Sequence, residues 1–275
     1  MIMCRSASEL RRIKAANQLV GRVLETVREA VTPGITTADL DALAERAIRD
    51  GGATPAFKGY KGYPATICAS LNEQVVHGIP SSKTALKEGD IISIDLGALL
   101  EGFYGDSAVT VGVGAIAPKA AELLRVTEES LWKGIDVVRP GARISDIGHA
   151  VQKHVEAFGF SVVREFVGHG IGSELHEEPQ IPNYGEPGRG PRLAEGMVLA
   201  IEPMVNAGGA GVKVLQDGWT AVTSDRSLSA HFEHTVAVTS DGVEVLSRPS
   251  DSERSGAGQW APASGANRRG AGAPG

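Results

Sequence analysis

The hydrophobic positions along the chain predict amphipathic helices followed by groups of strands. Residues 8–31 carry apolar side chains at helical spacing, with charges on the opposite face: Leu10, Ile13, Val20, Leu24 and Val27. Ser6 and Glu9 match a capping box before this helix, and Pro33-Gly34 ends it. A second helix is expected from Thr36 or Thr37 to about residue 50, closed by Gly51-Gly52.

Apolar runs between turn residues predict strands near residues 65–70, 75–77, 90–96 and 107–113. Two more helices are expected, near 118–136 and from Ser145 to Gly159. Strands then follow near 161–167, 197–202, 212–214, 219–225 and 232–246. Two helices and a group of strands therefore occur twice in the same order.

A sequence repeat supports this division. Leu86-Lys-Glu-Gly-Asp-Ile-Ile-Ser-Ile-Asp95 returns without a gap as Leu193-Ala-Glu-Gly-Met-Val-Leu-Ala-Ile-Glu202, 107 residues later. The repeat predicts two similar halves, about 8–113 and 118–246, within one domain of residues 1–247. Each repeated strand ends in a carboxylate, so Asp95 and Glu202 can meet if the halves face each other.

Composition narrows the class of protein. A chain of 275 residues with 42% hydrophobic and 22% charged residues is typical of a globular protein with a large core. The net charge of −6 argues against a general nucleic-acid binder. Two cysteines, no signal peptide and no membrane-length apolar run favour the cytoplasm. Residues 248–275 are rich in Gly, Ala, Ser, Pro and Arg, which predicts a disordered tail.

Several candidate metal ligands lie at or near the ends of predicted strands. Asp95 and Asp106 bracket a predicted hairpin with its turn near Glu101-Gly102, and the apolar run before Asp95 indicates a buried strand. A buried carboxylate needs a partner. Each candidate has an ordinary alternative on its own, since strand-end acids are often solvated and a histidine between glycines is often an incidental loop residue.

Three further candidates come from the second half: His169 between glycines, Glu202 before a proline, and Glu233 at the start of the last apolar strand. His176 follows seven residues after His169. Two aspartates, two glutamates and one histidine form an oxygen-rich set that suits two divalent ions. Paired ions activate a bridging water, which is hydrolase chemistry.

Ordered motifs give the chain a family resemblance. They are Asn72-Glu-Gln-Val-Val-His77-Gly-Ile-Pro80, Asp95, Gly105-Asp106, Gly168-His169-Gly-Ile-Gly172, His176-Glu-Glu-Pro179, Ile201-Glu202-Pro-Met204, Asp217-Gly-Trp219-Thr220 and Glu233-His-Thr235. In this order they resemble type I methionine aminopeptidases of the bacterial kind, from residue 5 to about 247. The resemblance implies an α+β "pita-bread" fold, with two αβ halves around a curved antiparallel sheet.

The resemblance also implies a mechanism. Five ligands would hold two divalent ions (Co, Mn, Fe or Zn): Asp95, Asp106, His169, Glu202 and Glu233. A water activated by the two ions would attack the scissile carbonyl, with Glu202 as the proton shuttle. His176 would hydrogen-bond the scissile carbonyl, and His77 would contact the scissile nitrogen. The implied substrates are nascent polypeptides with a small second residue, met at the ribosome by a monomeric enzyme without nucleic-acid readout or membrane contact.

An apolar and aromatic methionine pocket is implied at Tyr60, Tyr63, Cys68 and Trp219. Phe57 and Leu175 occupy pocket positions where relatives usually carry other residues, and His231 replaces the more usual glutamine. Asn72 and Ser229 match positions that hold a monovalent cation in relatives.

Three other interpretations compete. Prolidase and aminopeptidase P share the implied fold and ligands but usually carry an additional N-terminal domain, and type II methionine aminopeptidases carry a helical insert that is not seen here. A non-catalytic peptide-binding protein on the same fold would have lost ligands. A structural protein would pair its buried acids with arginine or lysine.

Overall fold

The computed structural model describes residues 2–248. Its helices are α1 (Ala7–Ala30), α2 (Thr37–Asp50), the short 3-10 helix η1 (Tyr60–Gly62), α3 (Pro118–Asp136) and α4 (Ile144–Ala157). The first-half strands are β1 (Thr54–Pro55), β2 (Ile67–Leu71), β3 (Gln74–Val76), β4 (Ile91–Leu100) and β5 (Phe103–Gly112). The later strands are β6 (Ser161–Val162), β7 (Gly168–Gly170), β8 (Glu177–Ile181), β9 (Val198–Ile201), β10 (Met204–Asn206), β11 (Val212–Val214), β12 (Ala221–Thr223), β13 (Ser229–His231), β14 (Glu233–Thr239) and β15 (Gly242–Val245).

A central antiparallel sheet joins the two halves. Its strand order is β1-β4-β5-β14-β9-β7-β8, with β2 also paired to β4 and β15 to β14. Strand β14, from the end of the chain, lies between β5 of the first half and β9 of the second. Two smaller three-stranded sheets, β13-β10-β6 and β11-β12-β3, flank the central one.

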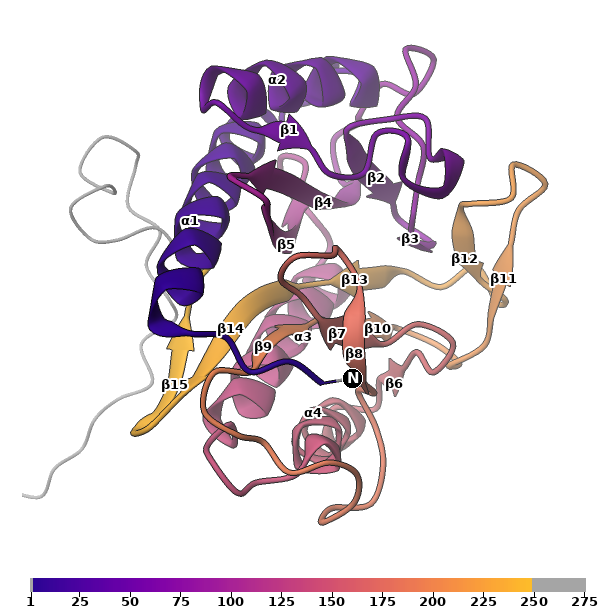
Figure 1. Ribbon diagram of the computed structural model, residues 1–275. Helices are drawn as coiled ribbons and strands as arrows, with labels where there is room; N and C mark the ends of the chain where they lie inside the picture. Colours follow the sequence, from indigo (N-terminus) through magenta and orange to yellow (C-terminus); the bar gives the residue numbers. More distant parts are fainter. Residues whose placement is uncertain (1, 249–275) are drawn as a thin grey trace, which may run out of the picture.

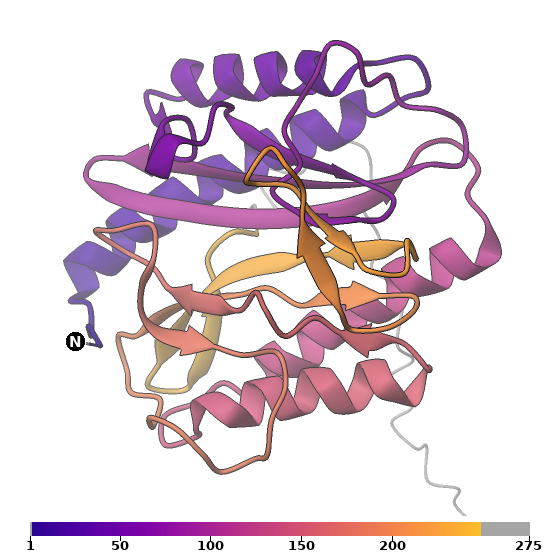
Figure 2. The same ribbon diagram turned by 90° about the vertical axis from the view of Figure 1, so that its right-hand side faces the viewer.

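The helices cover the sheet in pairs. Helices α1 and α2 pack on the strands of the first half, and α3 and α4 on those of the second (Figure 1). Figure 2 shows the two helical pairs on opposite sides of the strands. Each pair closes its own hydrophobic core, which removes apolar area from water and drives the packing. The pita-bread fold expected from the sequence is confirmed.

The two halves use the same contacts at the same offset. The Gly34 N–H donates to the Leu86 carbonyl at 2.8 Å, and the Gly141 N–H donates to the Leu193 carbonyl at 2.8 Å. Isolated bridges join Thr36 to Ala85 and Arg143 to Arg192. Each of these pairs is related by 107 residues, as the repeat predicts. The assignment of residues 1–247 to one domain stays a prediction, and the predicted tail lies outside the described residues apart from its first residue.

Helix starts follow the sequence closely. Ser6 and Glu9 form the expected capping box at α1, and Thr36, not Thr37, is the N-cap of α2. Both boxes satisfy backbone N–H groups that the first turn of a helix leaves without partners.

Strands were predicted less well than helices. The run expected at 161–167 forms only the short β6, and the run at 232–246 is two strands, β14 and β15, with a turn at Ser240 and Asp241. Gly242, at φ 142°, ends that turn. Strands β1, β7, β8, β10 and β13 were not predicted, because glycine, polar residues, proline or very short length hide their period of two. The predicted hairpin turn is confirmed, since Leu100 pairs with Phe103.

Candidate metal centre

Alternation along β4 and β5 sends Asp95 and Asp106 to the same face of the central sheet. Ile92 and Ile94 of β4 lie in the core beneath α1 and α2, so Asp95 points to the opposite face. Asp95 pairs with Ala108 of β5, and Asp106 precedes Ala108 by two residues. Both carboxylates therefore leave the sheet on the side away from the helices.

The strands of the second half add three side chains to this face. Glu233 of β14 also pairs with Ala108. Ala200 of β9 pairs with His169 on one side and with Thr235 of β14 on the other. Glu202 follows Ala200 by two residues, just beyond β9. All five predicted ligands thus share one face, with small alanines between them leaving room.

Distances show how closely these side chains gather. Ligand atoms of Asp106, His169 and Glu233 all lie within 4.8 Å of one another. His169 Nε2 lies 3.5 Å from Glu202 Oε1 and 4.0 Å from Asp106 Oδ2. Asp106, His169 and Glu233 are buried, whereas Asp95 and Glu202 are partly buried. The structure therefore brings the five candidates together, and their roles as ligands stay a prediction.

The ring of His169 is oriented as a metal ligand would be. Its Nδ1 lies 2.9 Å from the Gly170 carbonyl oxygen, which can only accept, so Nδ1 carries the proton. Burial lowers the pKa of His169 to about 4, so the ring is neutral at pH 7. Nε2 is then an acceptor facing carboxylate oxygens of Glu202 and Asp106. Lone pairs that face one another in this way need a metal ion or a proton between them.

The four carboxylates of the site also need a positively charged partner. Burial raises the pKa of Asp95 to about 7, and burial together with the neighbouring acids raises the pKa values of Asp106, Glu202 and Glu233. Oδ1 of Asp95, Oδ1 of Asp106 and Oε1 of Glu233 have no hydrogen-bond partner among the described residues. Ion pairs of these acids within residues 2–248 involve only histidines. Such a donor set fits divalent cations and does not fit a structural protein with acids paired to arginine or lysine.

Neighbouring groups fix the ligand-bearing backbone. The Asp106 N–H donates to Asn17 Oδ1 of α1 at 3.2 Å, and Thr235 Oγ1 donates to the Asp106 carbonyl at 2.8 Å. A side chain at Gly105 would lie 2.8 Å from the backbone of Ala16, so only glycine lets α1 approach β5 this closely. The helix therefore sets the position of Asp106.

Two further histidines lie at the edge of the site. The ring of His176 lies 4.3 Å from the ring of His169 and 5.3 Å from that of Tyr60, whose hydroxyl is 2.9 Å from His176 Nδ1. His77, at φ 60°, lies edge-on to Phe166 at 5.4 Å and to Trp219 at 6.3 Å. Sequence analysis identified both histidines but not Phe166, for which no motif gives a signal.

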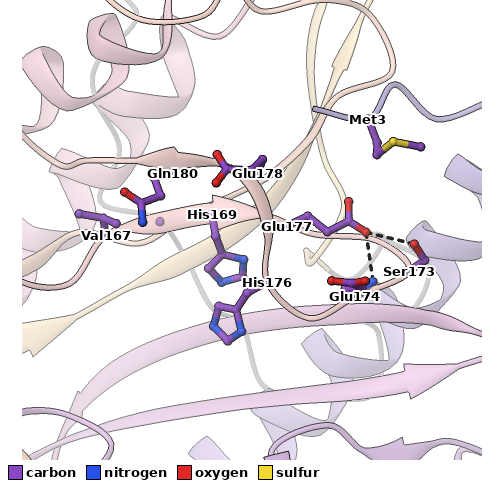
Figure 3. Close-up of a pocket in the computed structure, with 10 residues that line it drawn as sticks. Met3, Val167, His169, Ser173, Glu174, His176, Glu177, Glu178 and Gln180 are labelled. Atoms are coloured by element: carbon purple, nitrogen blue, oxygen red, sulfur yellow. Dashed lines mark hydrogen bonds between the residues drawn. The ribbon is translucent and has the colours of Figure 1, made fainter. Parts of the chain in front are cut away.

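A cavity of about 620 Å³ borders the site. Its lining includes His169 and His176, whose side chains lie next to each other in Figure 3. Glu174, Glu177 and Glu178 line the same cavity. Of these three, Glu177 is paired with Arg5, so Glu174 and Glu178 make the opening acidic.

The six predicted pocket residues lie in one hydrophobic cluster. Its members include Phe57, Tyr60, Tyr63, Cys68, Leu175 and Trp219. Cys68 pairs with Asp95 across β2 and β4, so the cluster adjoins the candidate ligands. Burial raises the pKa of the Cys68 thiol, which is therefore protonated and packs as an apolar group.

The structure also shows what surrounds the remaining candidates, Asn72, Ser229 and His231. The Ser229 N–H donates to the Asn72 carbonyl at 2.9 Å, so the two proposed cation-binding positions are joined. His231 is 2% exposed, and its Nε2 lies 3.7 Å from Glu202 Oε2. Burial lowers the pKa of His231 to about 3. Sequence analysis gave no role to His231, because only the fold places it against Glu202.

Comparison with known proteins identifies the family. The model of metallopeptidase family M24 matches residues 11–240. The chain belongs to family M24. The enzymes of this family are metallopeptidases, which agrees with the gathering of buried carboxylates and His169 at one site.

Relatives within the family are methionine aminopeptidases. The chain is 55% identical over 248 residues to methionine aminopeptidase 1 of Bacillus subtilis, covering 90% of this chain and 100% of that protein. The crystal structure of methionine aminopeptidase from Thermotoga maritima has a TM-score of 0.89 and 49% identity, again covering 90% of this chain and 100% of that one. These matches confirm the family resemblance drawn from the sequence motifs.

The prolidase from Pyrococcus horikoshii is a more distant structural match within the M24 fold. It has a TM-score of 0.73 and 24% identity, and this chain covers 65% of its length. At this identity the match shows a shared fold alone. No helix within residues 2–248 is both long and apolar enough to cross a membrane.

Proposed function

We propose that this M24 enzyme removes the N-terminal methionine from nascent polypeptides whose second residue is small. The observation that carries the proposal is the convergence of Asp106, His169 and Glu233 within 4.8 Å, with Asp95 and Glu202 beside them. The 55% identity to a methionine aminopeptidase over nearly the whole chain supports the substrate class.

The five converging side chains would hold two divalent ions of Co, Mn, Fe or Zn. When bound, such ions lower the pKa of a shared water and stabilise negative charge that develops on a carbonyl oxygen. Glu202 accepts the proton of the attacking water and delivers it to the departing amide nitrogen. Burial and the neighbouring Asp95 and Asp106 raise the pKa of Glu202 above its ordinary value, which favours a carboxylate that takes up a proton.

The two edge histidines position the substrate. His176 donates a hydrogen bond to the scissile carbonyl oxygen from Nε2, because its Nδ1 is engaged by Tyr60. His77 contacts the scissile nitrogen and sets the course of the chain after the first residue. The methionine side chain enters the cluster of Phe57, Tyr60, Tyr63, Cys68, Leu175 and Trp219, whose rings suit a thioether.

The runner-up is a prolidase-like dipeptidase, and a non-catalytic peptide-binding homologue comes after it. The shared fold gives no reason to prefer either alternative to a methionine aminopeptidase. Retention of all five candidate ligands, with His77 and His176 beside them, argues against the non-catalytic alternative. The apolar cluster next to Asp95 favours an unbranched apolar first residue over the substrates of a prolidase.

The wider context of the reaction follows from the substrate. We expect the enzyme to act as a monomer in the cytoplasm, where nascent chains leave the ribosome, without reading nucleic acid. A monovalent cation near Asn72 and Ser229 is a further expectation, consistent with the hydrogen bond that joins the two residues.

Peptide hydrolysis tests the proposal. Metal-free protein is given Mn²⁺ or Co²⁺ and assayed on Met-Ala-Ser and Met-Lys-Ser. We expect release of methionine from Met-Ala-Ser only with metal, and at least about 100-fold slower release from Met-Lys-Ser, since an added side chain must fit a closed site. Equal rates on the two peptides would contradict the assignment to nascent chains. Cleavage of Ala-Pro in preference to both would favour the prolidase alternative.

A further inference from the structure

The segment that precedes α1 crosses the loop that carries His176. Arg5 lies outside any helix or strand, yet its side chain is only 4% exposed. Its backbone N–H donates to the Gly196 carbonyl at 2.7 Å. Its guanidinium group binds both carboxylate oxygens of Glu177, 172 residues further along the chain. Both contacts come from Nη2, which places this charged group directly against the carboxylate.

Glu177 in turn holds its own loop together. Its Oε1 accepts hydrogen bonds from Ser173 Oγ at 3.2 Å and from the Glu174 N–H at 3.0 Å (Figure 3). One carboxylate therefore closes the turn before β8, while Arg5 neutralises its charge. The side chain of Glu177 is 11% exposed, so its loss of hydration is offset by these three partners.

Two glycines make room for Arg5. A side chain at Gly172 would overlap the Arg5 guanidinium group. A Cβ at Gly196, at φ +87°, would lie 2.7 Å from the Arg5 carbonyl oxygen. The loop and the turn before β9 thus both leave space for this one residue. A side chain at Gly172 would press on the guanidinium group of Arg5, and one at Gly196 would press on its backbone.

His176, the neighbour of Glu177, depends on this loop for its position. It is exposed, so close packing does not fix it. On its inner side the ring contacts Tyr60 and His169. On its outer side the backbone is anchored one residue away by Glu177 and Arg5. The ring is therefore held between the aromatic contacts and the ion pair.

We propose that Arg5 is a positioning residue for His176, acting through the Glu177 carboxylate and the turn of residues 173–177. This inference rests on the proposed function, in which His176 binds the scissile carbonyl. A misplacement of a binding group by about 1 Å can cost as much as about 100-fold in rate, so loss of the anchor lowers kcat. KM changes little, because His176 acts mainly on the charge that develops in the transition state.

A double-mutant cycle tests the inference on the metal-loaded full chain with Met-Ala-Ser. We expect Arg5→Met to lower kcat about tenfold with KM within about twofold, and Arg5→Lys to recover part of the loss. In the background of His176→Ala, Arg5→Met changes kcat by less than about twofold, since the residue through which it acts is gone. Arg11→Met, an exposed arginine on α1, is the matched control and leaves kcat unchanged. An equal loss in both backgrounds, or no loss, would overturn the proposal.

A second measurement does not use activity. In the metal-free protein, NMR signals of labelled histidine are assigned to His176 by their loss in His176→Ala. We expect Arg5→Met to shift or broaden these signals and to leave those of His154 on α4 unchanged. If Arg5→Met does not fold, Glu177→Gln takes its place. This variant keeps an acceptor for the loop and removes the charge that Arg5 binds, so the same change in the His176 signals is expected. Unmoved His176 signals in a folded variant would overturn the positioning role.

If His176→Ala retains full activity, the proposed role of His176 is wrong, while the NMR comparison still decides whether Arg5 positions it.

Discussion

The two halves of the molecule share a frame and differ in the chemistry they contribute. Of the five candidate ligands, only Asp95 and Glu202 are equivalent by the offset of 107 residues. The same offset would relate Asp106 of β5 to Lys213 of β11 and Glu233 of β14 to Val126 of α3, which are different elements, so it does not extend to the other ligands. The repeated frame therefore accounts for only two of the five candidate ligands.

Packing explains the difference. Ile92 and Ile94 of β4, beneath α1, correspond to Leu199 and Ile201 of β9, beneath α3, and an apolar side chain of similar volume is sufficient at each position. A metal ligand must instead place a particular donor atom at a particular position, so another residue of similar volume cannot replace it. Equivalent positions should therefore respond alike in the frame, unless one of them makes an additional contact, and differently at the site. Four predictions follow from this comparison and from the burial of the site.

The largest difference is expected between Glu202→Gln and Asp95→Asn. Both lose activity on Met-Ala-Ser, because each removes a charged candidate ligand. If Glu202 also moves the proton, its variant loses about 10²–10⁴-fold further, and added Mn²⁺ does not restore it. Asp95→Asn recovers at high Mn²⁺, since only affinity is lost. Rates are measured against metal concentration, with circular dichroism as the control for folding. Full recovery of Glu202→Gln would contradict the shuttle.

The next effect concerns the stability of the metal-free protein. Folding raises the pKa of Asp95 to about 7 from about 4 in the unfolded chain, so between these values the folded state binds more protons. The contribution of Asp95 to stability therefore falls as pH rises from about 4 to about 7, by at most ~4 kcal/mol, whereas the lowered pKa values of His169 and His231 act in the opposite direction below about pH 6.5. Urea unfolding of the metal-free parent protein and of Asp95→Asn at pH 5 and pH 7.5 isolates the part that belongs to Asp95. We expect Asp95→Asn to gain stability relative to the parent as pH rises, and added Mn²⁺ to stabilise the parent at pH 7.5; a difference between the two proteins that does not change with pH would contradict the account.

A smaller effect distinguishes the caps of α2 and α4. Asp39 accepts the N-cap N–H of Thr36 at 3.0 Å, and Asp146 accepts that of Arg143 at 2.8 Å. Asp146 also accepts the Gly188 N–H at 2.7 Å. Asp146→Ala should lower the melting temperature more than Asp39→Ala, because it loses one hydrogen bond more. Thermal melts of the two variants test the order, and an equal loss would show that the Gly188 contact is worth little.

The smallest difference is expected at the repeated glycines. Gly34 and Gly141 have φ +96° and +86°, and a Cβ at either would meet nothing within 4 Å. Alanine is therefore disfavoured only by the left-handed backbone, by about 1–2 kcal/mol at each position. Equal shifts of the melting temperature are expected for the two variants. A large inequality would show that the halves are less alike than their hydrogen bonds indicate.

Much of the fold was predictable because it depends on local and repeated signals. The Asp95 and Glu202 segments, the capping residues and the hairpin turn at Glu101-Gly102 each follow from neighbouring residues. Strand β8 was missed because its charged residues and proline give no strand period, and its pairing with β7 alone makes it a strand.

The candidate ligands were found through family motifs, and strand alternation explains why they meet. What surrounds them was not predictable. Asn17 reaches Asp106 across 89 residues, and Arg5 reaches Glu177 across 172. His231 faces Glu202 only because β10 and β13 pair. Contacts of this kind leave no local pattern, since each partner is an ordinary polar residue in its own segment.

Anomalous diffraction from crystals loaded with Mn²⁺ tests the central claim most directly. The account predicts two peaks within bonding distance of side chains from both halves, Asp95 and Asp106 on one side and His169, Glu202 and Glu233 on the other. Peaks only at exposed acids, or no peak near Asp106, His169 and Glu233, would contradict it.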